Sequence, residues 1–230
     1  MARKETDILI VTRKTPYDDG KYIIEALTRR DGLMSFQVTA KNTPKHSAKR
    51  IMLRPPFIVE AEYLSHPKFL PRILRTDWHY IYRRIGTDLR KTAVALFMCE
   101  TVSKILLPGN PDAEFFDYML RLLKKLDKET FDPDFHLHFM TEVSNFAGIR
   151  PEADKNGTFF DLNQGKFVRE ISGTTLNQTD SMLFARFLSG KKPENREERR
   201  RILHIWTKYF QIHLDRFRQP EVVEIYAGIF

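Results

Sequence analysis

Short runs of apolar and β-branched residues fill the first third of the chain, and turn-forming residues separate them. Such runs, with almost no helical periodicity, are typical of strands. We predict five strands, at residues 6–13, 21–29, 33–40, 57–64 and 72–82. Breaks rich in Pro, Gly or Asp are expected at 14–20, 30–32 and 67–71. Five consecutive short strands predict a small barrel such as an OB-fold, and an SH3-like barrel or a split sheet fits nearly as well.

From Gly86 onward the apolar residues follow a helical period. Thr87 can cap the first helix, and a small β-hairpin is predicted around Asn163–Gly165. Helices are expected at residues 87–107, from 110, from near 132 to 146, and at 180–188, 194–216 and 220–230. The predicted fold class is α+β, with an N-terminal five-stranded OB-fold barrel (1–82). An all-α helical domain follows (83–230), with the hairpin insertion at about 150–178.

The net charge of +8 is concentrated in the predicted barrel. Residues 1–80 hold 15 Lys and Arg against 9 Asp and Glu, whereas residues 81–230 hold 23 against 21. The basic run Lys41–Arg54 lies in a stretch without Asp or Glu, from Gly32 to Val59. By itself this run could be a solvated surface loop. Its place between two strands of the more basic module favours a flexible loop that contacts a polyanion such as DNA.

An OB-fold binds single strands through a cationic groove and stacked aromatic rings. The candidate DNA-binding residues are Lys21, Arg29, Arg30, Lys41, Lys45, His46, Lys49, Arg50, Arg54, Arg72 and Arg75. Candidate rings are Tyr17, Tyr22, Phe36, Tyr63, Trp78 and Tyr80. We expect most of these rings to fill the barrel interior, because a small barrel has to be packed with side chains.

Known catalytic motifs are missing from the sequence, which contains no phosphate-binding GxxxxGK[ST] loop, GxGxxG, HExxH or GxSxG. Asp18 and Asp19 are turn formers, although a divalent-metal nuclease could use them. His136 and His138 point to different sides of a helix and make a poor ligand pair. The single cysteine, Cys99, is expected to be buried, and we predict no metal and no cofactor. With no membrane span and no disulfide, we expect a cytoplasmic, nucleoid-associated protein.

Several local matches, in order along the chain, make the sequence similar to one family. They are Ile8–Val11 with Thr15–Tyr17, Ile23–Leu33, Lys45–Ser47 with Pro56–Phe57, Glu100 in its helix, Glu114–Leu120 and Phe146–Pro151. Together they resemble the RecO family, the bacterial recombination mediators of the RecF pathway. Many members carry a four-cysteine zinc motif after the segment ending at Pro151. Residues 150–178 contain no Cys, so the zinc does not carry over.

The resemblance implies an N-terminal OB-fold and a role without catalysis. It implies binding of single- and double-stranded DNA and annealing of complementary strands. With RecR, such a protein helps RecA replace single-strand-binding protein, whose acidic, Phe-ended C-terminal tail contacts the helical domain. Cations beside an apolar cleft would suit that tail: the candidates are Arg121, Lys124, Lys125, Arg199, Arg200 and Arg201. The alternatives are a nuclease using Asp18 and Asp19, or an RNA-binding or scaffolding OB-fold protein.

Overall fold

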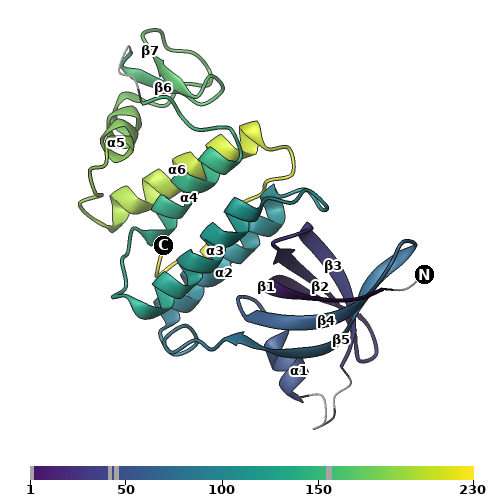
Figure 1. The fold of residues 1–230 in the computed structure, drawn as a ribbon. Helices are drawn as coiled ribbons and strands as arrows, with labels where there is room; N and C mark the ends of the chain where they lie inside the picture. Colours follow the sequence, from purple (N-terminus) through teal and green to yellow (C-terminus); the bar gives the residue numbers. More distant parts are fainter. Residues whose placement is uncertain (1–2, 41–42, 44–46, 154–156) are drawn as a thin grey trace. The chain divides into compact units, whose positions relative to one another are not determined.

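The computed structural model describes residues 3–40, 43, 47–153 and 157–230. Its N-terminal strands form a closed barrel in the order β1-β2-β3-β5-β4 (Figure 1). Strand β3 meets β5 in parallel at Gln37 and Arg72, and the other neighbours are antiparallel. The strands are β1 (Arg3–Asp18), β2 (Lys21–Thr28), β3 (Gly32–Thr39), β4 (Ile58–His66) and β5 (Phe69–Tyr80). The predicted fold class, an OB-fold barrel followed by helices, is confirmed.

Alternating apolar side chains fill the barrel. The barrel core cluster takes Ile24 and Ala26 from β2 and Phe36 and Val38 from β3, and the residue between the two members of each pair is more accessible. This period of two is what places one side of a strand in the core. The rings of Phe36 and Tyr63 meet edge to face with their centroids 5.1 Å apart, a favoured geometry for buried aromatics.

Two of the predicted breaks are confirmed but are shorter than predicted, since turns occupy only residues 19–20 and 67–68. Strand β1 continues through most of the first expected turn, where Lys14 pairs with Ile24 and Pro16 with Tyr22. Register shifts on either side accommodate the longer strand, and pairing with β2 outweighs the local turn preference. Strand β5 begins at Phe69 and includes Pro71, close to its start, where the missing N–H of proline is tolerated.

The basic run was predicted to be a flexible loop. This is wrong for part of it, because residues Ser47–Met52 form helix α1. Leu53, directly after the helix, is buried in the barrel core, and Met52 packs against the same core. These two apolar side chains anchor the segment, which explains why a basic run takes up regular structure. Lys41, Lys45 and His46 lie outside the described residues.

The chain divides into two compact units, Met1–Thr130 and Phe131–Phe230. The first contains the barrel, α1, α2 (Leu89–Ile105) and α3 (Ala113–Lys128). Asp88, and not Thr87 as predicted, caps α2, because the Asp88 side chain accepts from the Arg90 N–H. The Thr87 hydroxyl instead donates to the Arg84 carbonyl. Asp112 caps α3 by accepting from the Phe115 N–H.

Asp127, near the end of α3, ties that helix to the chain leaving the barrel. Its buried carboxylate accepts the backbone N–H groups of Arg83, Arg84 and Ile85 at 2.8–3.1 Å. It also accepts the Tyr80 hydroxyl at 3.1 Å. Burial by itself would raise the pKa of Asp127, but these hydrogen bonds hold it below its usual value.

The barrel also touches the connection between α2 and α3. The Gly109 N–H donates to the Leu33 carbonyl at 3.2 Å. Gly32 has a φ of +70°, and a Cβ there would collide with the Asn110 carbonyl. Glycine is therefore required at Gly32 both for its left-handed backbone and for the close approach of the two chain segments.

The second unit is mostly helical. It contains α4 (Phe135–Phe146), α5 (Gln178–Leu188), α6 (Arg196–His213) and α7 (Val222–Ile225). The predicted hairpin is confirmed as β6 (Phe159–Asp161) and β7 (Lys166–Val168). The predicted final helix is shorter, since only α7 is helical within 220–230. An aromatic core contains Phe160, Phe184, Trp206, Tyr209 and Phe210.

Candidate nucleic-acid interface

A cationic groove lies at the α1 end of the barrel, between that helix and strands β1 and β2. Its volume is about 510 Å³, and we name it the barrel groove. Its lining residues are Lys14, Pro16, Tyr22, Ser47, Arg50, Ile51 and Arg54. Arg50 and Arg54 were predicted DNA-binding residues and Tyr22 a candidate ring. The structure therefore brings part of the predicted set together in one concave surface.

Lys14 lies at the centre of the charge in this groove. Its Nζ donates to the Arg50 carbonyl at 2.9 Å and lies 4.3 Å from the centroid of the Tyr22 ring. Burial, then the nearby charges of Arg54 and Arg50, lower the pKa of Lys14 to about 8. Three cations thus repel one another here, and a bound anion would relieve that repulsion.

Sequence reasoning missed Lys14 because it assigned residues 14–20 to a turn. Continuing the strand would have shown that Lys14 and Pro16 share one side of β1. Both line the groove. The alternation of side chains along a strand could therefore have identified Lys14, but the Pro and Asp residues of the segment favoured a turn.

Four of the predicted DNA-binding cations are held by carboxylates. Lys21 Nζ lies 2.7 Å from Asp18, Arg29 contacts Asp117 at 3.0 Å, and Arg75 contacts Asp77 at 3.1 Å. Arg30 contacts Glu5 and Asp31. Such pairs are exposed and individually weak, so a phosphate could compete for these cations. These four cations line no part of the barrel groove.

Lys49 and Arg72 differ in their surroundings. Lys49 Nζ donates to the backbone carbonyls of Ile73 and Leu74 at 3.0 and 3.1 Å. Burial, then the Arg72 charge, lowers the pKa of Lys49. The Arg72 side chain is exposed on β5. Lys49 therefore holds α1 against β5, while Arg72 is open to solvent.

The prediction that most candidate rings are core is wrong, because only Phe36 and Tyr63 of the six are fully buried. Tyr17 is 66% exposed and Trp78 36% exposed. Tyr22 lines the barrel groove, and Tyr80 is half-buried. Tyr17 lies where β1 extends beyond the core, and Trp78 and Tyr80 lie on β5, which pairs with β3 at a single position. The rings at these positions do not fill the barrel interior. These rings are accessible for stacking.

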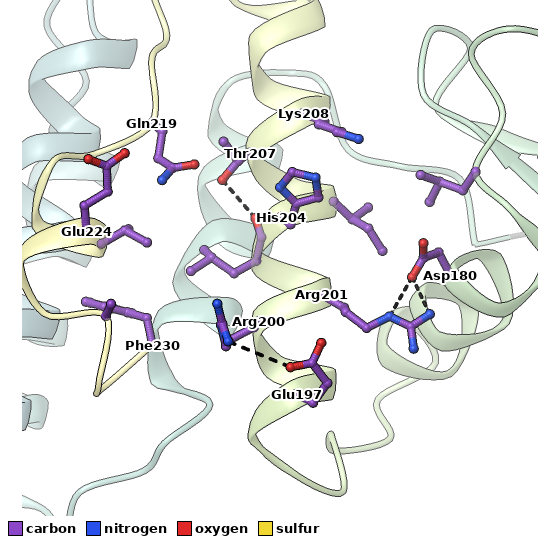
Figure 2. A pocket seen from close by; sticks show the side chains of 15 residues that line it. Asp180, Glu197, Arg200, Arg201, His204, Thr207, Lys208, Gln219, Glu224 and Phe230 are labelled. Carbon is purple, nitrogen blue, oxygen red and sulfur yellow. Dashed lines mark hydrogen bonds and ion pairs between the residues drawn. The ribbon is translucent and has the colours of Figure 1, made fainter.

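The predicted partner residues belong to two helices. Arg121, Lys124 and Lys125 lie on α3 and Arg199, Arg200 and Arg201 on α6. A pocket of about 460 Å³ beside α6, the α6 pocket, includes Arg200 and Arg201 with His204 and Lys208 (Figure 2). Its apolar side includes Leu203, Ile205, Val223 and Phe230.

Acidic partners occupy most of these arginines. Arg201 contacts Asp180 at 2.5 Å and Arg200 lies 3.9 Å from Glu197, as Figure 2 shows. Lys208 is exposed and lowers the pKa of neighbouring His204, after the larger effect of burial. The α6 pocket therefore combines cations with apolar surface, as a ligand with both an acidic and an apolar part would require.

Metal chemistry has no visible site in the described residues, which contain no cluster of three or more His, Cys, Asp or Glu suited to a metal ion. Asp18 instead holds Lys21. Burial lowers the pKa of His136 to about 3, and the His138 ring stacks on Phe187.

Cys99 is buried, as predicted, and burial raises its thiol pKa to about 12. None of the described helices is long and apolar enough to cross a membrane.

In the hairpin region, hydrogen bonds to Asp161 hold the loops together. Asp161 accepts from the backbone N–H groups of Asn163 and Gln164 at 2.9 and 3.0 Å. It also accepts from the hydroxyls of Ser172 and Thr174 at 3.0 Å each. This carboxylate joins the loops on both sides of β7.

Comparison with known proteins identifies one family. Residues 86–220 match the family model described as recombination protein O C terminal. The chain is 26% identical to the DNA repair protein RecO of Phocaeicola vulgatus and 24% to that of Flavobacterium psychrophilum. It is 28% identical to that of Bacteroides fragilis. Each comparison covers 96% of this chain and 97% of the relative. These three names describe DNA repair and give no catalytic activity.

Proposed function

The chain belongs to the RecO family of DNA repair proteins, and from this we propose that it binds single- and double-stranded DNA and anneals complementary strands. The single observation that supports this best is the barrel groove. Lys14, Arg50 and Arg54 are crowded there beside the Tyr22 ring. Cations next to an aromatic ring on an OB-fold suit a phosphate backbone with a neighbouring base.

The finer proposal concerns partners. With RecR, the protein would help RecA to replace single-strand-binding protein on DNA. The acidic, Phe-ended tail of single-strand-binding protein would bind in the α6 pocket. Exposed Lys208 beside the apolar Leu203 and Val223 supports this placement, because the tail would present carboxylates and an aromatic ring together.

Annealing of protein-coated DNA tests the proposed function. Complementary labelled strands are coated with single-strand-binding protein, and duplex formation is followed with and without the protein. We expect the wild-type protein to accelerate annealing at least tenfold. The double variant Arg50→Ala with Arg54→Ala should lose most of that acceleration, since about 1.4 kcal/mol of lost binding corresponds to a tenfold effect.

The control variant is Lys191→Ala with Lys192→Ala, which removes the same charge from two exposed positions outside the groove. It should anneal as the wild type does. If the wild-type protein gives no acceleration, the mediator role is wrong. Shortening of the labelled strands in the presence of magnesium or manganese would instead support the nuclease alternative.

A further inference from the structure

A second group of cations surrounds Tyr80, where β5 ends beside α3. We name Arg83, Arg84, Lys124 and Lys128 the β5–α3 cluster. The Nζ atoms of Lys124 and Lys128 lie 5.3 and 6.0 Å from the centroid of the Tyr80 ring. A pocket of about 560 Å³ is lined by Tyr80, Ile81, Arg83, Arg84, Asp127 and Lys128. Three of the four cations thus line one concave surface, and Lys124 lies over the ring of Tyr80, which lines it too.

The positive charge of this cluster is only partly balanced by nearby carboxylates. Within the described part of the chain, none of its four cations forms an ion pair, in contrast to Arg29 or Arg75. The carboxylate in the pocket wall is that of Asp127, which is buried and accepts hydrogen bonds from four donor groups. It reduces the positive potential but is not available to hold a side-chain cation.

Asp127 also organises the cluster. By accepting the N–H groups of Arg83 and Arg84 it holds the backbone of both residues, while their side chains are exposed. A binding surface whose backbone is already held loses less conformational entropy when a ligand binds. Lys124 and Lys128 suit the C-terminal end of α3 electrostatically, but that effect does not account for the two arginines.

Contacting rings join the β5–α3 cluster to the barrel groove. Phe57 donates its N–H to the carbonyl of Arg54, a groove residue, at 2.9 Å. The Phe57 ring stacks on Tyr82 with centroids 5.9 Å apart, and Tyr82 meets Tyr80 at 5.5 Å. Trp78, 36% exposed, packs edge to face on Phe57. Cations, rings and further cations therefore follow one another across the first compact unit.

We propose that the β5–α3 cluster binds the phosphates of the same nucleic-acid strand that occupies the barrel groove. The proposal rests on the proposed function and extends its binding surface from the barrel to α3. Continuity with the groove through partly accessible rings favours nucleic acid over an acidic protein segment, which would need no stacking surface between two cationic sites.

Salt titrations with two DNA lengths test this. The probes are fluorescent single strands of roughly 6 nucleotides, near the lower end of the site sizes of OB-folds, and roughly 30 nucleotides, well above them. The cluster variant is Arg84→Ala with Lys128→Ala, and Lys191→Ala with Lys192→Ala is the charge-matched control. Both cluster side chains are exposed and outside the barrel core, and circular dichroism and thermal unfolding verify that each variant is folded.

We expect the cluster variant to bind the long strand about tenfold more weakly than the control. Its slope of log affinity against log salt should fall by about 1.4, since each lost phosphate contact on a single strand accounts for about 0.7. Affinity for the short strand should match that of the control. The groove variant, Arg50→Ala with Arg54→Ala, should weaken binding of both strands.

The outcomes separate the two proposals. A wild-type protein that binds neither strand contradicts the proposed function itself. A wild-type protein that binds both, together with a cluster variant that behaves like the control on the long strand, contradicts only the role of the cluster. Equal weakening on both strands also contradicts it, because a separate site beyond the groove should matter only to the longer strand.

Discussion

At the scale of the residue, Lys14 is unusual because its surroundings disfavour its own charge. Burial, Arg54 and Arg50 together bring its pKa to about 8 in the free protein. A bound phosphate would favour the charged amine and raise that pKa again. Binding of DNA in the barrel groove should therefore be accompanied by proton uptake at mildly alkaline pH.

We expect DNA affinity to fall about tenfold from about pH 7 to about pH 9 as Lys14 loses its proton, the equivalent of about 1.5 kcal/mol for one charge-assisted contact. In Lys14→Arg the cation stays charged throughout, so the fall should disappear. Fluorescence anisotropy at constant ionic strength measures both proteins. An equal fall in the two proteins would show that another group is responsible.

As pH rises, the contribution of Lys14 to fold stability should increase, whereas its contribution to DNA affinity should decrease. The folded pKa of Lys14 lies below its ordinary value of 10.5, so between about pH 8 and about pH 10 the unfolded chain binds more protons. The Lys14 contribution to stability therefore increases as pH rises through this window. Weaker DNA binding over the same range cannot then be attributed to unfolding through Lys14.

At the scale of the element, one side chain can decide how helices join strands. The caps of α2 and α3 could be sought in sequence because a cap lies within a few residues of its helix. The link from Asp127 to the backbone of Arg83, Arg84 and Ile85 could not, since it spans more than forty residues. No local pattern distinguishes Asp127 from a solvated acid on a helix.

Replacing Asp127 with Asn should lower the free energy of unfolding by about 3 kcal/mol, because charged hydrogen bonds to buried groups are lost. Urea unfolding at pH 7 measures this. Asp117→Asn, also on α3, is the matched control, and as half of an exposed ion pair it should cost less than about 1 kcal/mol. Similar losses in both variants would contradict a special role for Asp127.

The effect of Asp127 should also depend on pH. Its folded pKa is lowered, so its contribution is present above the unfolded pKa of about 3.9 and is lost as pH falls through the folded pKa. The difference between wild type and Asp127→Asn should therefore shrink in acid. A difference that stays constant down to low pH would indicate that shape, not charge, matters at this position.

At the scale of the whole molecule, the division of the chain can be tested directly. The change of hydrophobic period predicts a boundary after residue 82, whereas the first compact unit extends to Thr130. We expect the fragment 1–130 to unfold cooperatively. The fragment 1–82 should be less stable, because it lacks the contacts of Asn110, Asp117 and Asp127 with the barrel and its exit.

Thermal unfolding followed by circular dichroism compares the two fragments. Equal cooperativity and midpoint would support the boundary at residue 82 and show that α2 and α3 add little to the barrel. A fragment 1–130 that fails to fold would indicate that the first unit depends on the remainder of the chain. Until then, the barrel domain of 1–82 and the helical domain of 83–230 stay predictions.

The sequence alone was sufficient for the order of strands and helices apart from α1, the OB-fold class, the hairpin near Asn163, the burial of Cys99 and the family resemblance. These depend on the hydrophobic period, on turn residues and on local motifs, all of which act over short stretches of chain. The excess of basic residues in the barrel module is likewise a property of composition.

Only the tertiary structure decided which cations are available. Arg29 and Arg54 look alike in sequence, yet one meets Asp117 on α3 and the other lines the barrel groove. Lys14, Arg50 and Arg54 come together through strand pairing and the packing of α1, as Arg83 and Lys128 do through Asp127. Charge neutralisation depends on distance in space, and the folded chain sets that distance independently of separation in sequence.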